Sequence, residues 1–180
     1  MKFEREFEIA YVGLHLGIHQ YKYNINNSFF EHFDNTDFKN TNIEVKLTLD
    51  KKLNIFLLHF EVIGKTIVDC DRCGDEFECK LWDEFNLVIK QVDEHLVNEL
   101  NEADAEIVHI SKSESILNVA EWIYEFAILS IPLQHIHPND ASGKGTCNPI
   151  VLKLLKLPTE HSSNKMWEEL KRKKIVNNKN

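Results

Sequence analysis

Segments with strand periodicity flank the motif Cys70-Asp-Arg-Cys73-Gly74, and this arrangement strongly limits how the chain can fold. Residues 41–49 and 53–63 place apolar side chains at every second position, and residues 77–89 do so after the motif. A period of two is typical of strands with one buried face. The sequence therefore predicts an antiparallel meander whose last two strands are joined by a turn that carries the cysteine pair.

The buried face of these strands follows from the parity of the apolar positions. Gly64 is expected to end the second strand, and residues 65–69 then lead into the cysteine motif. Cys79 shares the parity of the apolar residues around it, so we expect it to point into the core. The predicted inward-facing side chains are Ile43, Val45, Leu47, Leu49, Phe56, Leu58, Phe60, Val62, Phe77, Cys79, Leu81, Phe85, Leu87 and Ile89.

The N-terminal part gives two further strand signals. Residues 3–11 alternate apolar and acidic side chains, which predicts a half-buried strand with Phe3, Phe7, Ile9 and Tyr11 on its inner side. Residues 14–25 continue the pattern with a change of parity at Gly17, where a bulge or turn would explain the switch. After it, Asn26-Asn27-Ser28 offers an N-cap to a short helix that carries Phe29, Phe30 and Phe33.

The segment between the meander and Pro132 is predicted to contain a connector, a strand and a helix. Residues 93–106 hold six acidic side chains and no lysine or arginine, which indicates an acidic connector, and residues 107–110 fit a last strand. Asn118-Val-Ala-Glu121 resembles a capping box, so the main helix is predicted over 119–130, ending before Pro132.

The chain divides into a β-rich domain, 1–131, and a C-terminal part, 132–180. The second part holds an irregular loop rich in histidine, followed by short helices expected at 149–157 and 164–174. With 180 residues, 43% of them hydrophobic, the chain can bury a substantial core. We predict an α+β fold: an antiparallel sheet or partly open barrel of about six strands, with one main helix and a C-terminal arm of short helices.

Four residues form a candidate structural zinc site that would join the hairpin turn to the C-terminal part: Cys70, Cys73, His137 and Cys147. Zinc prefers four nitrogen or sulfur ligands in a tetrahedron, and a Cys-x-x-Cys-Gly turn can present two of them. The His…Cys spacing is not that of a standard zinc finger, and His135 and Asp140 are alternatives to His137. The competing interpretation is a set of reduced thiols beside a loop.

A thiol oxidoreductase is the enzymatic interpretation of the same cysteine pair. Such enzymes lower the thiol pKa at a helix N-terminus, whereas the flanks here are strands. Asp69, Asp71, Asp75 and Glu76 are expected to oppose thiolate formation. No Ser/His/Asp signature, glycine-rich phosphate loop or His-Glu-x-x-His motif occurs, so the sequence favours a protein that is not an enzyme and has no small-molecule substrate.

Charge is unevenly distributed along the chain. Residues 164–180 carry six basic and two acidic side chains, so the remainder has a formal charge of −12, against −8 for the whole chain. An acidic body disfavours wrapping by nucleic acid, but a basic arm with an aromatic residue suits RNA stacking and phosphate contact. The alternative is a helix that docks on its own domain with its lysines in water. The candidate RNA-binding residues are Trp167, Lys171, Arg172, Lys173 and Lys174.

The N-terminus lacks the apolar stretch of a secretion signal, and no segment approaches the length needed to cross a bilayer. We therefore expect a cytoplasmic protein with no membrane partner. In a reducing compartment a Cys-x-x-Cys pair is typical of metal binding or redox activity rather than of a structural disulfide.

Three blocks, in this order, resemble the YceD-like family, a bacterial and plastid group linked to accumulation of large-subunit ribosomal RNA. The first is residues 68–77, Val-Asp-Cys-Asp-Arg-Cys-Gly-Asp-Glu-Phe. The second runs from Asn118 through Leu129-Ser-Ile-Pro-Leu133 to His137 and Cys147, and the third is residues 164–172. Many relatives carry more cysteines in the second block, with a Cys-Gly pair, whereas here Cys147 precedes Asn148-Pro149.

The resemblance implies a non-enzymatic factor in processing or accumulation of large-subunit ribosomal RNA, with that RNA or a pre-ribosome as partner. A protein-binding adaptor without RNA contact is the alternative, and the thiol oxidoreductase is the second alternative. RNA binding through a basic arm would weaken steeply with salt, whereas an apolar protein interface would not.

Overall fold

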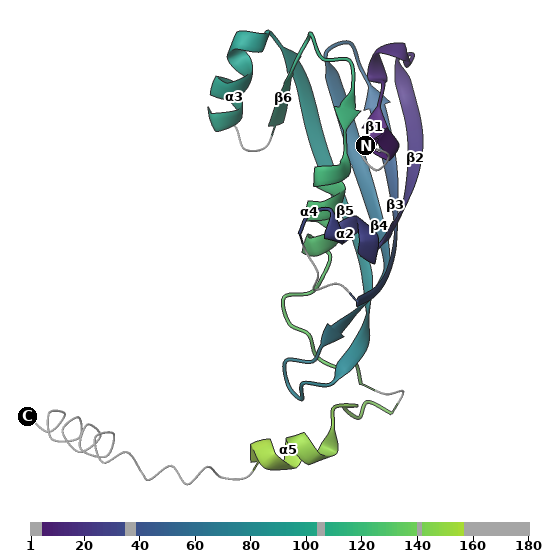
Figure 1. The fold of residues 1–180 in the computed structure, drawn as a ribbon, viewed down its shortest axis with the longest axis vertical. Helices are drawn as coiled ribbons and strands as arrows, with labels where there is room; N and C mark the ends of the chain where they lie inside the picture. The colour runs from purple at the N-terminus through teal and green to yellow at the C-terminus, as the bar shows by residue number, and fades with distance from the viewer. Residues whose placement is uncertain (1–4, 35–38, 104–106, 140–141, 157–180) are drawn as a thin grey trace, which may run out of the picture.

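Five strands form the main sheet of the protein, in the order β2-β3-β4-β5-β6 (Figure 1). The computed structural model describes residues 5–34, 39–103, 107–139 and 142–156. All neighbouring strands of this sheet are antiparallel except β5 and β6, which are parallel, and the sheet does not close into a barrel. The strands span Gly17–Asn26 (β2), Lys39–Lys51 (β3), Ile55–Asp69 (β4), Glu76–Val92 (β5) and Ile107–Ser111 (β6).

Short elements accompany the sheet, and together they confirm the predicted α+β class. The small pair β1 (Glu8–Ile9) and β7 (Leu117–Asn118) forms a second, two-stranded sheet. The α-helices are α2 (Asn27–Glu31), α3 (Val97–Ala103), α4 (Ala120–Leu129) and α5 (Pro149–Lys156), and two 3-10 turns lie at Tyr11–Gly13 (η1) and Glu94–Leu96 (η2).

The core lies between one face of the sheet and the layer formed by α2, α4 and the β1–β7 pair (Figure 1). Aromatic contacts fix α4 on the sheet: Phe126 packs on Phe60 and Phe85, with ring centroids 4.9 and 4.4 Å apart. All inward positions predicted for β3 and β4 are buried, and those of β5 are buried or half-buried within the same core. The period of two therefore identified the core of the meander correctly.

Gly64 does not end a strand, contrary to the prediction, because β4 continues through it to Asp69. A Cβ atom at this position would lie 2.5 Å from the backbone oxygen of Asn42 and 2.6 Å from the Cα of Ile43. Gly64 is paired directly with Ile43 of β3, next to the register shift between Lys39 and Asn42. The glycine thus permits a close approach of two strands and does not break one.

The strand predicted over 3–11 is also wrong in extent. Of the described residues 5–11, Glu8–Ile9 is the part that forms a strand; η1 follows it, and β2 begins at Gly17 rather than at residue 14. Phe7, Ile9 and Tyr11 are nevertheless buried as expected, whereas Phe3 lies outside the described residues. The alternation predicted burial correctly, but the partner strand β7 is only two residues long, so the pairing ends early.

The acidic segment after β5 is a helical crossover, whereas the sequence indicated only a connector. It contains η2 and α3, and it returns the chain so that β6 runs parallel to β5. Parallel neighbours need such a crossover, so the meander prediction does not extend to β6. Asn101 of α3 supports the arrangement, since its amide donates to the His109 carbonyl at 3.0 Å and its Oδ1 accepts the His109 N–H at 2.7 Å.

The main helix begins one residue later than predicted and ends one residue earlier. The Asn118 side chain still accepts a hydrogen bond from the Ala120 N–H at 2.9 Å, at the start of α4. The predicted boundary between domains at 131/132 stays a prediction. Within the described parts of the chain, no helix is long and apolar enough to cross a membrane.

Candidate metal centre

The hairpin between β4 and β5 ends in a tight turn built by the Cys70–Gly74 motif, as the sequence predicted. The Cys70 N–H donates to the carbonyl of Asp75 at 3.0 Å, and the Gly74 N–H donates to the carbonyl of Cys70 at 2.8 Å. Gly74 has a φ of +75°, in the left-handed region where a side chain is strained. The turn therefore directs both cysteines of the motif to one side, where each is buried.

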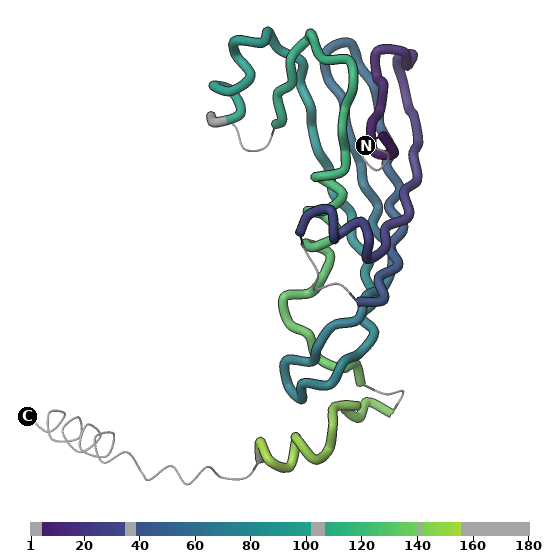
Figure 2. Tube along the Cα trace, in the orientation of Figure 1, coloured from purple at the N-terminus to yellow at the C-terminus, as the bar shows by residue number. Residues whose placement is uncertain are grey.

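The chain returns to this turn after α4, so that residues far apart in sequence lie side by side (Figure 2). Asp71 and His135 join them through two hydrogen bonds. The Asp71 N–H donates to the His135 carbonyl at 2.7 Å, and the His135 N–H donates to Asp71 Oδ2 at 2.6 Å. A further hydrogen bond, from Asn148 Nδ2 to Asp75 Oδ2 at 3.1 Å, holds the segment that follows Cys147.

The structure brings all four predicted ligands together. One ligand atom from each of Cys70, Cys73, His137 and Cys147 lies within 4.8 Å of the others. The Sγ atoms of Cys70 and Cys147 are 3.9 Å apart, and Cys73 Sγ is 3.5 Å from His137 Nδ1. A disulfide would need about 2.05 Å between sulfurs, so the thiols are free.

These separations fit a tetrahedral zinc ion. Zn–S bonds of about 2.3 Å and Zn–N bonds of about 2.0–2.1 Å, at tetrahedral angles, place two sulfurs about 3.8 Å apart and a sulfur and a nitrogen about 3.6 Å apart. The observed distances are 3.9 and 3.5 Å. The Cys3His donor set is also one that zinc uses in structural sites. The four residues can therefore hold such an ion.

An apolar shell surrounds the cluster. The three cysteines are buried, and Phe77, Ile136, Val151 and Leu152 pack against them. Phe77 also contacts the His137 ring, with centroids 4.7 Å apart, and this contact restrains the imidazole. Such second-layer contacts orient a ligand and exclude water, as a closed structural site requires.

Electrostatics at the cluster differ from the sequence-based expectation. Burial raises the pKa of Cys70, but hydrogen bonds from the backbone N–H groups of His137, Arg72 and Cys73 outweigh it and lower the pKa to about 6. Burial, followed by the neighbouring sulfurs of Cys70 and Cys73, raises the pKa of Cys147. The backbone amides thus stabilise a first thiolate despite the acidic neighbours, and further thiolates need a cation between them.

Asn148-Pro149 starts α5 directly after Cys147. Asn148 Oδ1 accepts the Ile150 N–H at 3.0 Å, and its carbonyl accepts the Leu152 N–H at 3.0 Å. Pro149 occupies the first helical position, where a missing N–H has no cost. The helix then places Val151 and Leu152 against the cysteines.

The other residues that the sequence analysis considered as metal ligands or RNA contacts are not part of this cluster. His135 lies beside it and supplies its backbone to Asp71, but it is not among the four ligands. Cys79 lies in the core on β5, as predicted. Asp140 and all five candidate RNA-binding residues, Trp167, Lys171, Arg172, Lys173 and Lys174, lie outside the described residues.

Two positioning residues, Asp71 and Asn148, were missed by the sequence reasoning. The sequence drew attention to Asp71 only for its charge, although an acidic side chain inside a tight turn can also accept backbone hydrogen bonds. Asn148 stood out only as a departure from the family. The pair Asn-Pro was a usable signal, because asparagine is a favoured N-cap and proline a favoured first helical residue.

A protein-family profile matches most of the chain. The profile of the family described as "Large ribosomal RNA subunit accumulation protein YceD" matches residues 58–172, which is more than half of the chain. Searches of curated proteins and of solved structures found no significant match.

Proposed function

The chain belongs to the YceD family, and we propose that it is a non-enzymatic factor in the processing or accumulation of large-subunit ribosomal RNA. The observation that carries this proposal is the family match, which spans β4, the cysteine turn, α4 and the C-terminal part. Its partner would be large-subunit ribosomal RNA or a pre-ribosome, and we expect it to act in the cytoplasm.

We further propose that the Cys3His cluster holds one structural zinc ion. The donor set, the spacing of its atoms and the apolar shell support this proposal. When bound, zinc would fix the His/Cys loop and α5 to the hairpin tip; all four protein ligands are then used, and no position is left for catalysis. The role of the metal would be to hold the C-terminal part at a defined place on the domain.

Contact with RNA is proposed through Trp167, Lys171, Arg172, Lys173 and Lys174. The charge pattern of the sequence supports it, because residues 164–180 have a net positive charge while the remainder of the chain is acidic. Changing Lys171, Lys173 and Lys174 to glutamine should make the salt dependence of binding to single-stranded RNA less steep. The slope of the logarithmic plot should fall by about 0.7 for each phosphate that the protein no longer neutralises. An unchanged slope would contradict contact through these side chains.

The decisive test is made in the native cells. The gene is deleted, and the ratio of large-subunit to small-subunit ribosomal RNA is compared with that of the complemented strain. We expect the ratio to fall on deletion, to be restored by the unmodified protein and by Cys79→Ala, and to stay low with Cys147→Ser. UV crosslinking of the tagged protein, followed by sequencing, should recover large-subunit ribosomal RNA or its precursor. An unchanged ratio would refute the proposed function.

A protein-binding adaptor is the second candidate, and one feature of α5 favours it. Ile150 and Leu154 stand one turn apart on this helix and are 69% and 62% exposed. Apolar side chains at this spacing are typical of helices that dock in a partner's groove. A ribosomal RNA phenotype on deletion without any crosslinked RNA would favour this role over direct RNA contact.

A further inference from the structure

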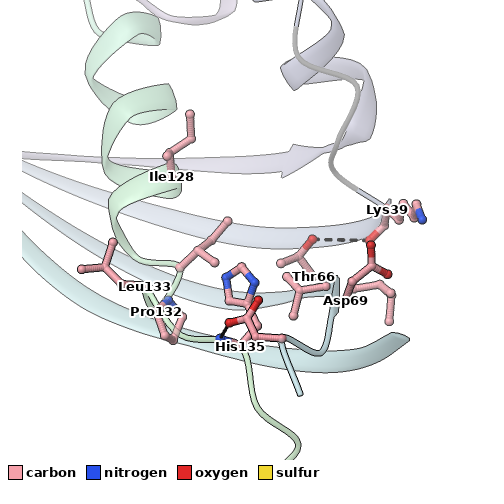
Figure 3. A pocket seen from close by; sticks show the side chains of 11 residues that line it. Lys39, Thr66, Asp69, Ile128, Pro132, Leu133 and His135 are labelled. Carbon is pink, nitrogen blue, oxygen red and sulfur yellow. Dashed lines mark hydrogen bonds between the residues drawn. The ribbon is translucent and has the colours of Figure 1, made fainter. Parts of the chain in front are cut away.

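A pocket of about 490 Å³ lies beside the candidate metal centre, between the end of β4 and the segment that follows α4. Figure 3 shows Ile128, Pro132 and Leu133 on one side and Lys39, Thr66 and Asp69 on the other, with His135 between them. The volume is within the range of ligand-binding pockets. Asp71 and His135, which are joined by two hydrogen bonds, both line the pocket.

The walls of this pocket are apolar, and its polar groups carry an excess of negative charge. Ile67, Val68, Ile128 and Ile131 contribute aliphatic surface from both sides. Lys39 is already paired with Glu76, outside the pocket, at 2.6 Å.

Among the described residues, neither of the two lining carboxylates, Asp69 and Asp71, forms an ion pair. Lys39 acts on Asp69 only at longer range, because the pKa of Lys39 is raised first by Glu76 and then by Asp69. Asp71 Oδ2 accepts the uncharged backbone N–H of His135. A ligand with a cationic group would supply the missing positive charge, whereas a phosphate would be repelled.

Leu133 at the rim adds apolar surface that a ligand in the pocket could cover. Its side chain is fully exposed, and Pro132 next to it is exposed as well. The ligand chemistry that matches an aliphatic slot with carboxylates at one side is an alkyl stem that ends in a cation. Arginine and lysine have this form, because their methylene groups pack on apolar surface while the charged end reaches a carboxylate.

We propose that this pocket binds an arginine or lysine side chain of a basic polypeptide, with Asp69 and Asp71 as its charge partners and Leu133 as an apolar contact. The inference goes beyond the proposed RNA contact and is independent of it, because it concerns other residues and a ligand of opposite charge. The peptide-binding test can therefore fail while the ribosomal RNA test of the proposed function succeeds, and the reverse.

The test uses the zinc-loaded full chain and a fluorescein-labelled peptide that carries two arginines in a Gly-Ser spacer. The matched peptide contains citrulline, which keeps the shape of arginine but has no charge. Fluorescence anisotropy measures both affinities. The variant Asp69→Asn/Leu133→Ala removes one charge and one exposed leucine at the pocket. The control Glu94→Gln/Leu53→Ala makes the same changes at the other end of the sheet, where both residues are exposed.

We expect the arginine peptide to bind at least tenfold more tightly than the citrulline peptide. The pocket variant should bind the arginine peptide about tenfold more weakly, consistent with removal of one solvent-exposed charge pair and one apolar contact. The control variant should bind this peptide as tightly as the unmodified protein does. Equal affinity of the two peptides, no measurable binding, or equal weakening in both variants would overturn the proposal. Binding of a single-stranded RNA oligonucleotide is measured in the same way. If the pocket variant weakens RNA binding and the control variant does not, the proposal is also overturned. Circular dichroism melting of each variant identifies any loss of folding.

Discussion

Removal of zinc should loosen the C-terminal part of the described chain while the sheet stays folded. The cluster around the cysteines is separate from the main core, and Phe77 is the side chain that packs against both. The metal would therefore be the main link between the hairpin tip and residues 132–156. Its loss should open this segment locally and leave β3 and β4 protected.

The size of the effect follows from the loop that the metal closes. Cys73 and Cys147 are 74 positions apart in the sequence, and a cross-link over a loop of this length is worth about 4.5 kcal/mol in the chain-entropy description. The hydrogen bonds between Asp71 and His135 and between Asn148 and Asp75 are present with and without zinc, so they do not reduce this difference. The loss is therefore at most about 4.5 kcal/mol, which corresponds to an increase in local opening of up to roughly 2000-fold.

Hydrogen exchange with mass spectrometry measures this increase. Peptides covering 132–156 and 70–76 are compared between the zinc-loaded protein, the chelator-treated protein and Cys147→Ser, with Cys79→Ala as a control that should keep one zinc per chain. The reasoning is refuted by unchanged exchange in 132–156 after zinc removal. It is refuted equally by an increase that is as large in β3 and β4 as at the hairpin tip.

Three stability predictions follow from individual contacts, each checked by urea denaturation or exchange. Gly64→Ala should cost about 3 kcal/mol, because the added Cβ meets backbone atoms of β3, whereas Gly13→Ala, with nothing within 4 Å, should change stability by less than about 0.5 kcal/mol. Equal effects of the two would contradict the close approach at Gly64. Asn148→Ala should cost about 1 kcal/mol and increase exchange in α5, while Asn148→Ser should restore protection; no difference between the two would exclude capping. Tyr11→Phe should cost about 1 kcal/mol, because its buried hydroxyl donates to the Glu114 carbonyl and accepts from Gln91; an unchanged midpoint would show that water replaces these bonds.

The meander was predictable because strand periodicity is a local property. Each residue of β3 and β4 lies on the inner or outer face according to its parity, so the sequence alone identified Ile43 to Leu49 and Phe56 to Val62 as core. The place of the cysteine motif between two such strands followed directly. The α+β class also followed, since only one long helical pattern accompanies the strands.

Features that depend on a distant partner could not be predicted in the same way. Gly64 looks like a strand end, and only the approach of β3 shows that it permits close backbone packing. The length of β1 depends on β7, more than 100 positions away. The parallel direction of β6 depends on the helical crossover through α3, whose acidic sequence resembles a solvated connector.

The candidate metal site shows the same division. The sequence by itself determined the donor types and one half of the site, because the two cysteines of the turn are fixed by local geometry. Only the tertiary structure shows that His137, and not His135, lies with the three cysteines, because the hydrogen bonds between Asp71 and His135 set the position of the returning chain. It also created the pocket beside the site, whose two walls are more than 50 positions apart and meet only when the chain has folded. Local periodicity fixes which residues face inward, whereas the meeting of distant segments depends on the packing of the whole chain.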